Sequence, residues 1–150
     1  MLEGRGIAGP SDLPESNHPN SIDGCTDGNR GKYQKQGSVD RIRIGAVDGK
    51  HFREGSIIFI EAYVYARKNL PYTVDFYHAS DATDPKWTFV GEKSAVTTNG
   101  FKKLTVVHAI QGGVLQAVRV NLRDGDRKEG STCTLGNRND VDDLVFAVSE

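Results

Sequence analysis

Residues 56–66 read SIIFIEAYVYA, and this run decides the class of fold that the rest of the chain must join. If the run is extended, its even-numbered side chains are aliphatic: Ile58, Ile60, Ala62 and Val64. Its odd-numbered side chains are aromatic or charged: Phe59, Glu61, Tyr63 and Tyr65. This period of two is typical of a β-strand that packs one face against an apolar core. The run therefore predicts a long strand with one aliphatic and one aromatic face.

The same alternation recurs along the chain, at residues 38–47, 72–79, 86–92, 101–110, 114–123 and 142–149. The first of these stretches carries one slip of the pattern near Asp40 and Arg41. Turn-forming Gly, Pro, Asn and Asp residues separate the stretches, and no segment has a convincing helical period. Seven to eight strands at this spacing predict an all-β fold, a single antiparallel β-sandwich of jelly-roll type.

The first 21 residues differ from the rest, because they have no apolar run and are rich in Gly, Pro, Ser and Asn. That composition is typical of flexible segments, and the tail also lacks the apolar centre of a signal peptide. Residues 1–10 look like a remnant of cloning, and residues 11–21 look like a linker. We therefore expect one folded β-sandwich module over residues 22–150, cut from a larger secreted protein.

Composition excludes some partners. The chain of 150 residues has 19 basic and 20 acidic side chains, so it lacks the basic surplus of a dedicated nucleic-acid binder. The same balance gives no reason to expect strong attraction to anionic membranes. No apolar run approaches the ~20 residues that a membrane-spanning helix needs. We expect neither nucleic acid nor a membrane span among the partners.

Cys25 and Cys133 are the two cysteines of the chain, and they lie in loop-like sequence at opposite ends of the folded part of the chain. The first and last strands of a sandwich are often neighbours, so a disulfide between the two residues is geometrically plausible. Such a bond implies an oxidising, extracellular setting. The alternative is two free thiols in a cytosolic protein.

Acidic residues surround both cysteines. Asp23 and Asp27 flank Cys25, and three carboxylates follow Cys133 at Asp140, Asp142 and Asp143. If the disulfide forms, these oxygen atoms converge, and calcium takes six to eight oxygen ligands. Alternation also places Asp142 on the apolar face of its strand, where an unpaired carboxylate is costly. We expect a structural calcium ion held by these five carboxylates; the alternative is a solvated turn in which they cap backbone amides.

A second set of side chains has the chemistry of sugar recognition, in which a ring packs on C–H bonds and polar neighbours bind hydroxyls. The aromatic candidates are Tyr63, Tyr65, Tyr77 and Trp87, and the polar candidates are Asp75 and Arg119. Arg41, Arg43 and Asn121 could add further polar partners. The alternative is that these rings serve the core, because sandwiches use Tyr and Trp freely for packing.

Catalysis is not expected of this chain. Its four histidines, at residues 18, 51, 78 and 108, lie in the tail, in a turn or inside strands. The sequence has no metalloprotease HExxH motif, no GxSxG nucleophile motif and no phosphate-binding loop. A triad built from separate strands stays open at this stage.

Four segments together resemble a known class of module: DGCTDGNRGKY at 23–33, VDFYHASDATDPKWTFVG at 74–91, LQAVRVNLR at 115–123 and CTLGNRNDVDDLVFAV at 133–148. They are similar to the non-catalytic C-terminal β-sandwich modules of secreted bacterial hydrolases and proteases. The closing DDLVFxV resembles the last strand of galactose-binding-like and other carbohydrate-binding jelly rolls. The resemblance implies calcium at Asp142 or Asp143, with Asp23, Asp27 or Asp140 as further ligands.

The resemblance also implies a function. We expect a secreted, non-catalytic module that binds polysaccharide and holds it near a catalytic domain on the same parent chain. The alternative is an accessory domain of a secreted protease that binds a protein substrate such as collagen or stabilises its catalytic neighbour. A small independent hydrolase is the third possibility.

Overall fold

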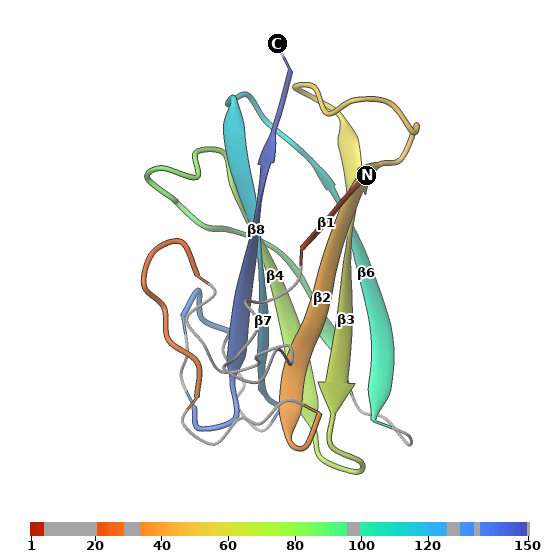
Figure 1. Ribbon diagram of the computed structural model, residues 1–150, viewed down its shortest axis with the longest axis vertical. Coiled ribbons are helices and arrows are strands. Elements are labelled where there is room, and N and C mark those ends of the chain that lie inside the picture. Colours follow the sequence, from red (N-terminus) through yellow and green to blue (C-terminus); the bar gives the residue numbers. More distant parts are fainter. Residues whose placement is uncertain (5–20, 29–33, 96–99, 126–129, 134–135, 150) are drawn as a thin grey trace.

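The computed structural model describes residues 1–4, 21–28, 34–95, 100–125, 130–133 and 136–149. Within these ranges the chain forms strands and no helix (Figure 1), which confirms the predicted all-β class. The strands are β1 (Leu2–Gly4), β2 (Gly37–Ala46), β3 (Ile57–Ala66), β4 (Tyr72–Ala79), β5 (Thr88–Ser94), β6 (Phe101–Ala109), β7 (Leu115–Asp124) and β8 (Asp140–Ala147). Since the described residues include no long apolar helix, none of them forms a helical membrane span.

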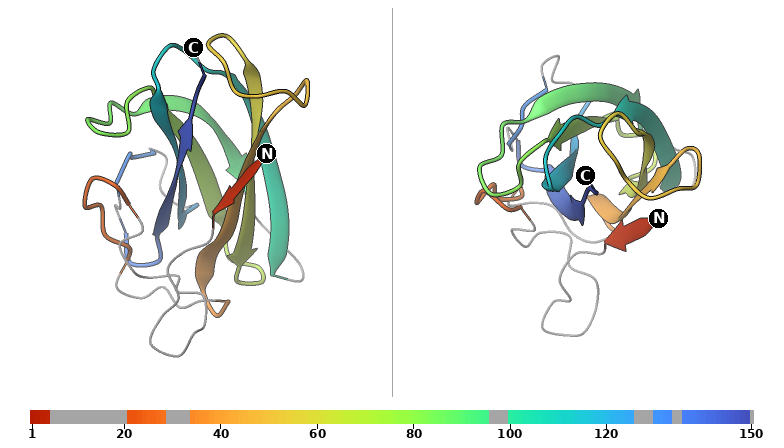
Figure 2. Two further views of the ribbon diagram at one scale, coloured as in Figure 1. Left: turned by 45° about the horizontal axis from the view of Figure 1, so that its top comes forward. Right: turned by 90° about the horizontal axis from the view of Figure 1, so that it is seen from above.

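The strands form two antiparallel sheets of four strands each. One sheet has the order β1-β2-β3-β6 and the other has the order β5-β4-β7-β8. Seen along the strands, the two sheets enclose a common interior (Figure 2). β2 lies beside β8 on one side of the molecule and β5 lies beside β6 on the other. The predicted sandwich of seven to eight antiparallel strands is confirmed.

The strand order shows how the chain passes between the sheets. If β2 to β8 are labelled A to G, the immunoglobulin constant-type sandwich would pair them as ABED and CFG. Here the fourth strand, β5, pairs with β4, so that the two sheets are ABE and DCFG. The order is therefore closer to an immunoglobulin-type sandwich than to a jelly roll. Alternation along one strand does not specify which strand lies next to it. The strand order therefore could not be predicted from the sequence.

The core lies between the sheets and follows the alternation of residues 56–66. Ile58, Ile60, Ala62 and Val64 of β3 are buried, and they face apolar side chains of β4 and β7. Burying an isoleucine or valine side chain stabilises the fold by roughly 1.5–3 kcal/mol. The slip at residues 40–41 is a shift of register in β2 between Val39 and Arg41, which keeps Ile42 and Ile44 in the core.

Part of the N-terminal segment that was expected to be a cloning remnant is extended. Residues 2–4 form the short strand β1, which pairs with β2 in the register Leu2↔Ile44 and Gly4↔Ile42. The outer edge of β2 has backbone N–H and C=O groups that an extended segment can pair with, and β1 pairs with part of this edge. Residues 5–20 lie outside the described ranges.

Candidate functional site

A disulfide joins the two cysteine-containing loops, as predicted. The Cα atoms of Cys25 and Cys133 are 5.5 Å apart, within the usual range for a disulfide, and the bond spans 108 positions of the sequence. The bond fastens residues 21–28 to residues 130–133 on the outer side of β7 and β8, where Figure 1 and Figure 2 show the two segments next to each other. The head and tail of the folded region therefore meet at this face.

Arg119 of β7 anchors both loops to the sheet. Its fully buried guanidinium donates two hydrogen bonds of 2.8 Å to Asp143, which lies opposite it on β8, and one of 2.6 Å to Asp23. It also donates to the Thr132 carbonyl at 2.5 Å. Burial alone would lower the pKa of Arg119, but the bonds to Asp143 and Asp23 raise it. Arg119 is therefore a buried positive charge at physiological pH.

The two carboxylates respond to Arg119 differently. Burial raises the pKa of Asp143, and the bonds from Arg119 oppose the rise only in part. Burial also acts on Asp23, but hydrogen bonds from Arg119 and from the Trp87 indole hold the pKa of Asp23 below its ordinary value. The second oxygen of Asp143 also accepts the backbone N–H of Ile22 at 2.8 Å. The ion pair therefore holds the start of the folded chain in place.

A second buried ion pair lies on the same sheet face. Arg123 of β7 donates to Asp75 of β4 at 2.5 and 3.1 Å and to Glu92 of β5 at 3.0 Å. Burial raises the pKa of Asp75, and the bonds from Arg123 oppose that rise. The side chain of Glu92 is 59% exposed, whereas Arg123 and Asp75 are buried. Glu92 is therefore the member of this cluster that solvent or a ligand can reach.

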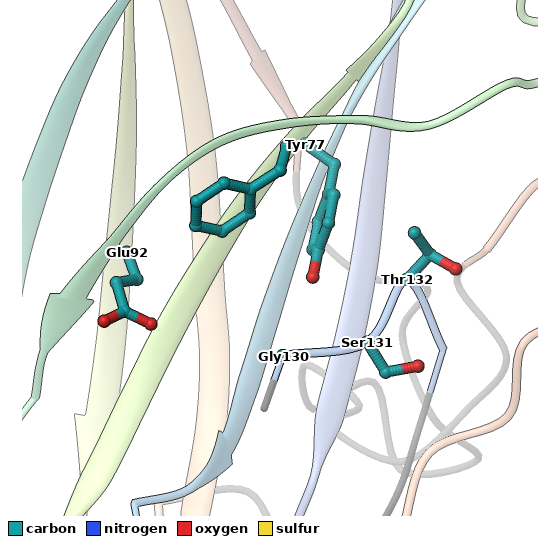
Figure 3. A pocket seen from close by; sticks show the side chains of 6 residues that line it. Tyr77, Glu92, Gly130, Ser131 and Thr132 are labelled. Atoms are coloured by element: carbon teal, nitrogen blue, oxygen red, sulfur yellow. The ribbon is translucent and has the colours of Figure 1, made fainter. Parts of the chain in front are cut away.

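A pocket of about 360 Å³ lies beside this ion pair. β4 and β5 contribute Tyr77, Phe89 and Glu92, and the disulfide-bonded loop contributes residues 130–132 (Figure 3). The Tyr77 and Phe89 rings meet edge to face, with centroids 5.6 Å apart. Burial, reinforced by the charge of Asp75, raises the pKa of Tyr77 to about 12. The phenol is therefore a neutral hydrogen-bonding group at the edge of the pocket.

The loop wall of the pocket is held at several points. Asn121 donates from its side chain to the Ser131 carbonyl at 2.8 Å, and Arg119 binds the carbonyl of Thr132. Gly130 packs so closely that a Cβ atom there would lie 2.8 Å from Asp75 Oδ2 and 3.1 Å from the Tyr77 hydroxyl. The disulfide and these contacts hold the loop wall of the pocket against the sheet.

No known protein family matches this chain, and no curated protein matches it either. The function of the protein is therefore argued from the geometry of the site.

The six predicted ligand residues lie on two opposite faces of the sandwich. Tyr77, Asp75, Arg119 and Trp87 belong to the face that bears the pocket, but only Tyr77 lines it. Asp75 and Arg119 are buried in ion pairs behind the pocket wall. The Trp87 ring packs on Arg119, with 4.1 Å between the guanidinium carbon and the ring centre, and its indole N–H donates to Asp23.

Tyr63 and Tyr65 lie on the outer face of β3, away from the pocket and not under the other sheet. The guanidinium of Arg41 packs 3.9 Å from the Tyr63 ring centre, and Arg43 donates to the Tyr63 hydroxyl at 2.8 Å. Tyr65 meets Phe101 of β6 edge to face at 5.2 Å. These two rings are partly exposed on an outer sheet face.

The five predicted calcium ligands also separate into two groups. Asp23 and Asp143 bind Arg119, whereas Asp27, Asp140 and Asp142 gather where β8 begins. Asp140 is fully buried and accepts the backbone N–H of Val39. Burial, reinforced by the charges of Asp142 and Asp27, raises the pKa of Asp140 well above its ordinary value. Asp142 lies on the buried face of β8, as alternation predicted.

Asp140 leaves an oxygen-bearing site that fits a cation only in part. Its Oδ1 atom is buried without a hydrogen-bond donor, and so is the side-chain amide of Asn139 beside it. However, within the part of the chain that the structure describes, no three acidic, histidine or cysteine side chains are arranged as a set of metal ligands. The chemistry of the donors suits calcium, but the described geometry alone does not complete a site.

Sequence reasoning missed the residues that complete the pocket, which are Phe89, Glu92 and residues 130–132. Phe89 pairs with Tyr77 across β4 and β5 only because the register shifts between Phe76 and Tyr77. Unlike residues 38–47, residues 72–79 alternate without a slip, so no signal in the sequence would have found this pair. The disulfide was the one available signal for the loop, since it places residues near Cys133 on this face.

Proposed function

We propose that this protein is a non-catalytic carbohydrate-binding module, and that the pocket between Tyr77, Phe89 and residues 130–132 is its binding site. The observation that carries the proposal is one cavity that combines aromatic rings with hydroxyl groups and a carboxylate. Small-ligand sites are typically concave and about 300–1,000 Å³ in volume, with few polar groups on mostly apolar walls. A volume of about 360 Å³ suits one or two sugar rings.

The groups around the pocket match the two needs of a sugar. The exposed Phe89 ring offers a surface for the C–H face of a pyranose. Tyr77, Ser131 and Thr132 carry hydroxyls that donate or accept, and Glu92 accepts from sugar hydroxyls. Because the walls are already held by ion pairs and the disulfide, binding would cost little ordering entropy.

The same groups support binding rather than reaction. Among the described residues that line the pocket, Glu92 is the one carboxylate, and Tyr77 is neutral over the physiological range. Acid–base catalysis needs two groups with suitably placed pKa values, and hydrolysis of glycosides usually needs two carboxyl groups. The described lining residues do not supply such a pair.

The opposite face favours a second candidate function. Ile57, Phe101 and Val107 on the outer face of β3 and β6 are each more than half exposed. Phe101 lies beside Tyr65 at one end of this face, and Val107 lies beside Phe59 toward the end that bears Ile57, so the three form a row along the face. Exposed apolar side chains in such a group are typical of protein interfaces. This face supports the alternative of an accessory domain that contacts a protein substrate such as collagen, or its own catalytic neighbour.

Two further expectations belong to this proposal. The Cys25–Cys133 bond supports secretion into an oxidising compartment, because such bonds persist there and are rare in the cytosol. The buried Oδ1 atom of Asp140, which accepts no hydrogen bond from the described residues, supports a structural calcium ion bound at Asp140. In that role the ion would neutralise the acidic cluster.

The test is binding to insoluble polysaccharides and to a glycan array, with Phe89→Ala as the site variant. Phe101→Ala is a matched control, because both rings are 54% exposed and they lie on opposite faces of the sandwich. We expect Phe89→Ala to lose binding and Phe101→Ala to keep it, with both folds intact by circular dichroism. Loss of binding only in Phe101→Ala would move the site to the opposite face. Wild-type protein that binds no glycan would overturn the proposal.

A further inference from the structure

Glu92 gives the pocket a negative charge as well as a hydrogen-bond acceptor, and a neutral sugar uses only the acceptor. Its Oε2 atom accepts from Arg123 at 3.0 Å, and its Oε1 atom has no donor among the described residues. The side chain is 59% exposed at the pocket wall (Figure 3). A carboxylate held from one side by a buried guanidinium presents its other oxygen in a fixed position.

The ion pairs behind the pocket do not cancel this charge. Two buried guanidinium groups face four carboxylates: Arg123 faces Asp75 and Glu92, and Arg119 faces Asp23 and Asp143. Of the three hydrogen bonds described between Arg123 and these carboxylates, two go to Asp75 and one goes to Glu92. Among these described side chains the carboxylates are in excess, and Glu92 is the one that a ligand can reach at the pocket.

The aromatic rings act in the same direction. The faces of Tyr77 and Phe89 carry the negative end of the ring quadrupole, which attracts cations within about 6 Å of the ring centre. Tyr77 is neutral, so its hydroxyl can accept a hydrogen bond from an ammonium group. An anionic sugar would meet both the carboxylate and the ring faces, and it would be repelled.

We propose that the pocket selects sugar units that carry a free ammonium group, such as glucosamine, over N-acetylated and acidic sugar units. This inference rests on the proposed carbohydrate-binding function and adds its ligand class. In the bound state the ammonium group contacts Glu92 and the ring faces of Tyr77 and Phe89. Residues 130–132 and the Tyr77 hydroxyl then bind the ring hydroxyls, which all three classes of sugar share.

The test is calorimetry at pH 6 with three oligosaccharides of equal length: glucosamine, N-acetylglucosamine and galacturonic acid. We expect glucosamine to bind roughly tenfold more tightly than the N-acetylated form, which is the gain from about one charge-assisted contact. Galacturonic acid should bind most weakly. Raised salt should reduce the difference between the first two.

Glu92→Gln is the matched variant, because an amide keeps the shape and the acceptor for Arg123 but removes the charge. It should abolish the preference for glucosamine and leave the affinity for N-acetylglucosamine within about twofold. Glu54→Gln removes the same charge from an exposed loop outside the pocket and should change nothing. Thermal melting of each variant shows whether it is folded.

The outcomes separate the two proposals. If both neutral and amino sugars bind equally and Glu92→Gln has no effect, carbohydrate binding stands and the charge selection is wrong. If none of the three sugars binds, or if a lysine-containing peptide binds in their place, the carbohydrate function fails and the selection fails with it. A preference that survives Glu92→Gln would also overturn the role given to Glu92.

Discussion

Arg119 and Trp87 form a stacked pair, in which the guanidinium carbon lies 4.1 Å from the centre of the indole ring. The Trp87 N–H donates at 2.8 Å to Asp23, a carboxylate that itself binds Arg119. The single tryptophan of the chain therefore covers a buried ion pair. Through these contacts Trp87 connects the β4–β5 side of the sheet to the disulfide-bonded loops.

Arg119→Met should destabilise the protein strongly. The change removes the guanidinium partner of the fully buried Asp143 carboxylate. Loss of one partner of a buried ion pair typically costs about 3–5 kcal/mol of unfolding free energy. Urea unfolding measures this loss. Arg41→Met is the control, since Arg41 also packs on an aromatic ring but is partly exposed, and it should cost no more than about 1 kcal/mol. Equal losses in the two variants would contradict the anchoring role of Arg119.

Reduction of the disulfide should loosen the pocket as well as the fold. In the chain-entropy description, a bond that closes a loop of 108 positions contributes roughly 4–5 kcal/mol. The Cys25→Ser, Cys133→Ser double variant should therefore unfold at lower urea concentration. It should also bind carbohydrate less tightly under conditions in which circular dichroism still shows β-structure. Unchanged binding in the folded double variant would show that residues 130–132 hold their place without the bond.

Gly130→Ala should damage the pocket from within. The new methyl group would lie 2.8 Å from Asp75 Oδ2, a buried atom that Arg123 holds in place, so the loop must move. We expect a loss of about 1–3 kcal/mol in urea unfolding and weaker carbohydrate binding. Gly112→Ala meets only the flexible Glu54 side chain at 3.4 Å or more, and it should be near neutral. If both variants behave alike, the close packing of Gly130 has no role in the site.

A pair of histidines makes stability depend on pH. His108 Nε2 lies 3.2 Å from His78 Nδ1 between the sheets, and His78 Nε2 bonds to Gln116 at 2.7 Å. Burial lowers the pKa of His78, although its bond to Gln116 opposes this, and burial with the charge of His78 lowers the pKa of His108. Both rings are thus neutral in the folded state at neutral pH.

The sign of the effect follows from these shifts. As the pH falls, the two histidine rings bind protons near pH 6.5 in the unfolded chain. In the folded protein they bind protons only at a lower pH. Stability from the pair is complete above about pH 6.5 and declines as the pH falls below that value through the lower folded pKa values. We expect the melting temperature to fall between pH 7.5 and pH 5, and His78→Gln to flatten this slope. Exposed His51→Gln is the control, and an equal flattening by it would contradict the role of the pair.

Calcium should raise the melting temperature if the acidic cluster at the start of β8 holds it. At 100 times the dissociation constant a bound ion adds about 2.7 kcal/mol, which is several degrees in a domain of this size. Asp140→Asn should remove the effect, whereas Asp48→Asn in an exposed turn should leave it unchanged. Identical melting curves with calcium and with a chelator would contradict the calcium proposal.

The fold could be predicted where local alternation decides it. The period of two placed Ile58 in the core and Tyr63 on the opposite face, and the slip in residues 38–47 marked the register shift at Val39–Arg41. The two cysteines identified the disulfide. These features depend on short stretches of chain, so one sequence is enough to find them.

The site could be predicted only in part, because it depends on which strands are neighbours. The sequence predicted that the acidic residues converge at one end of the sandwich. It could not show which of them bind Arg119 and which join the cluster around Asp140. That division depends on β7 lying next to β8, so that Arg119 meets Asp143. The sequence did not identify Phe89 and Glu92 as pocket residues for the same reason, because their neighbours in the pocket belong to β4 and to a distant loop.

The disulfide also sets the order in which the protein can mature during its synthesis. Tyr77 and Phe89 leave the ribosome early, yet the opposing wall of their cavity comes from residues next to Cys133, and its partner Cys25 was made 108 positions before. A nascent chain can therefore complete a sheet without gaining the ability to recognise a ligand. Under the proposed function, a chain whose Cys25–Cys133 bond has not yet formed would lack a fixed wall for its cavity and would bind its ligand less tightly.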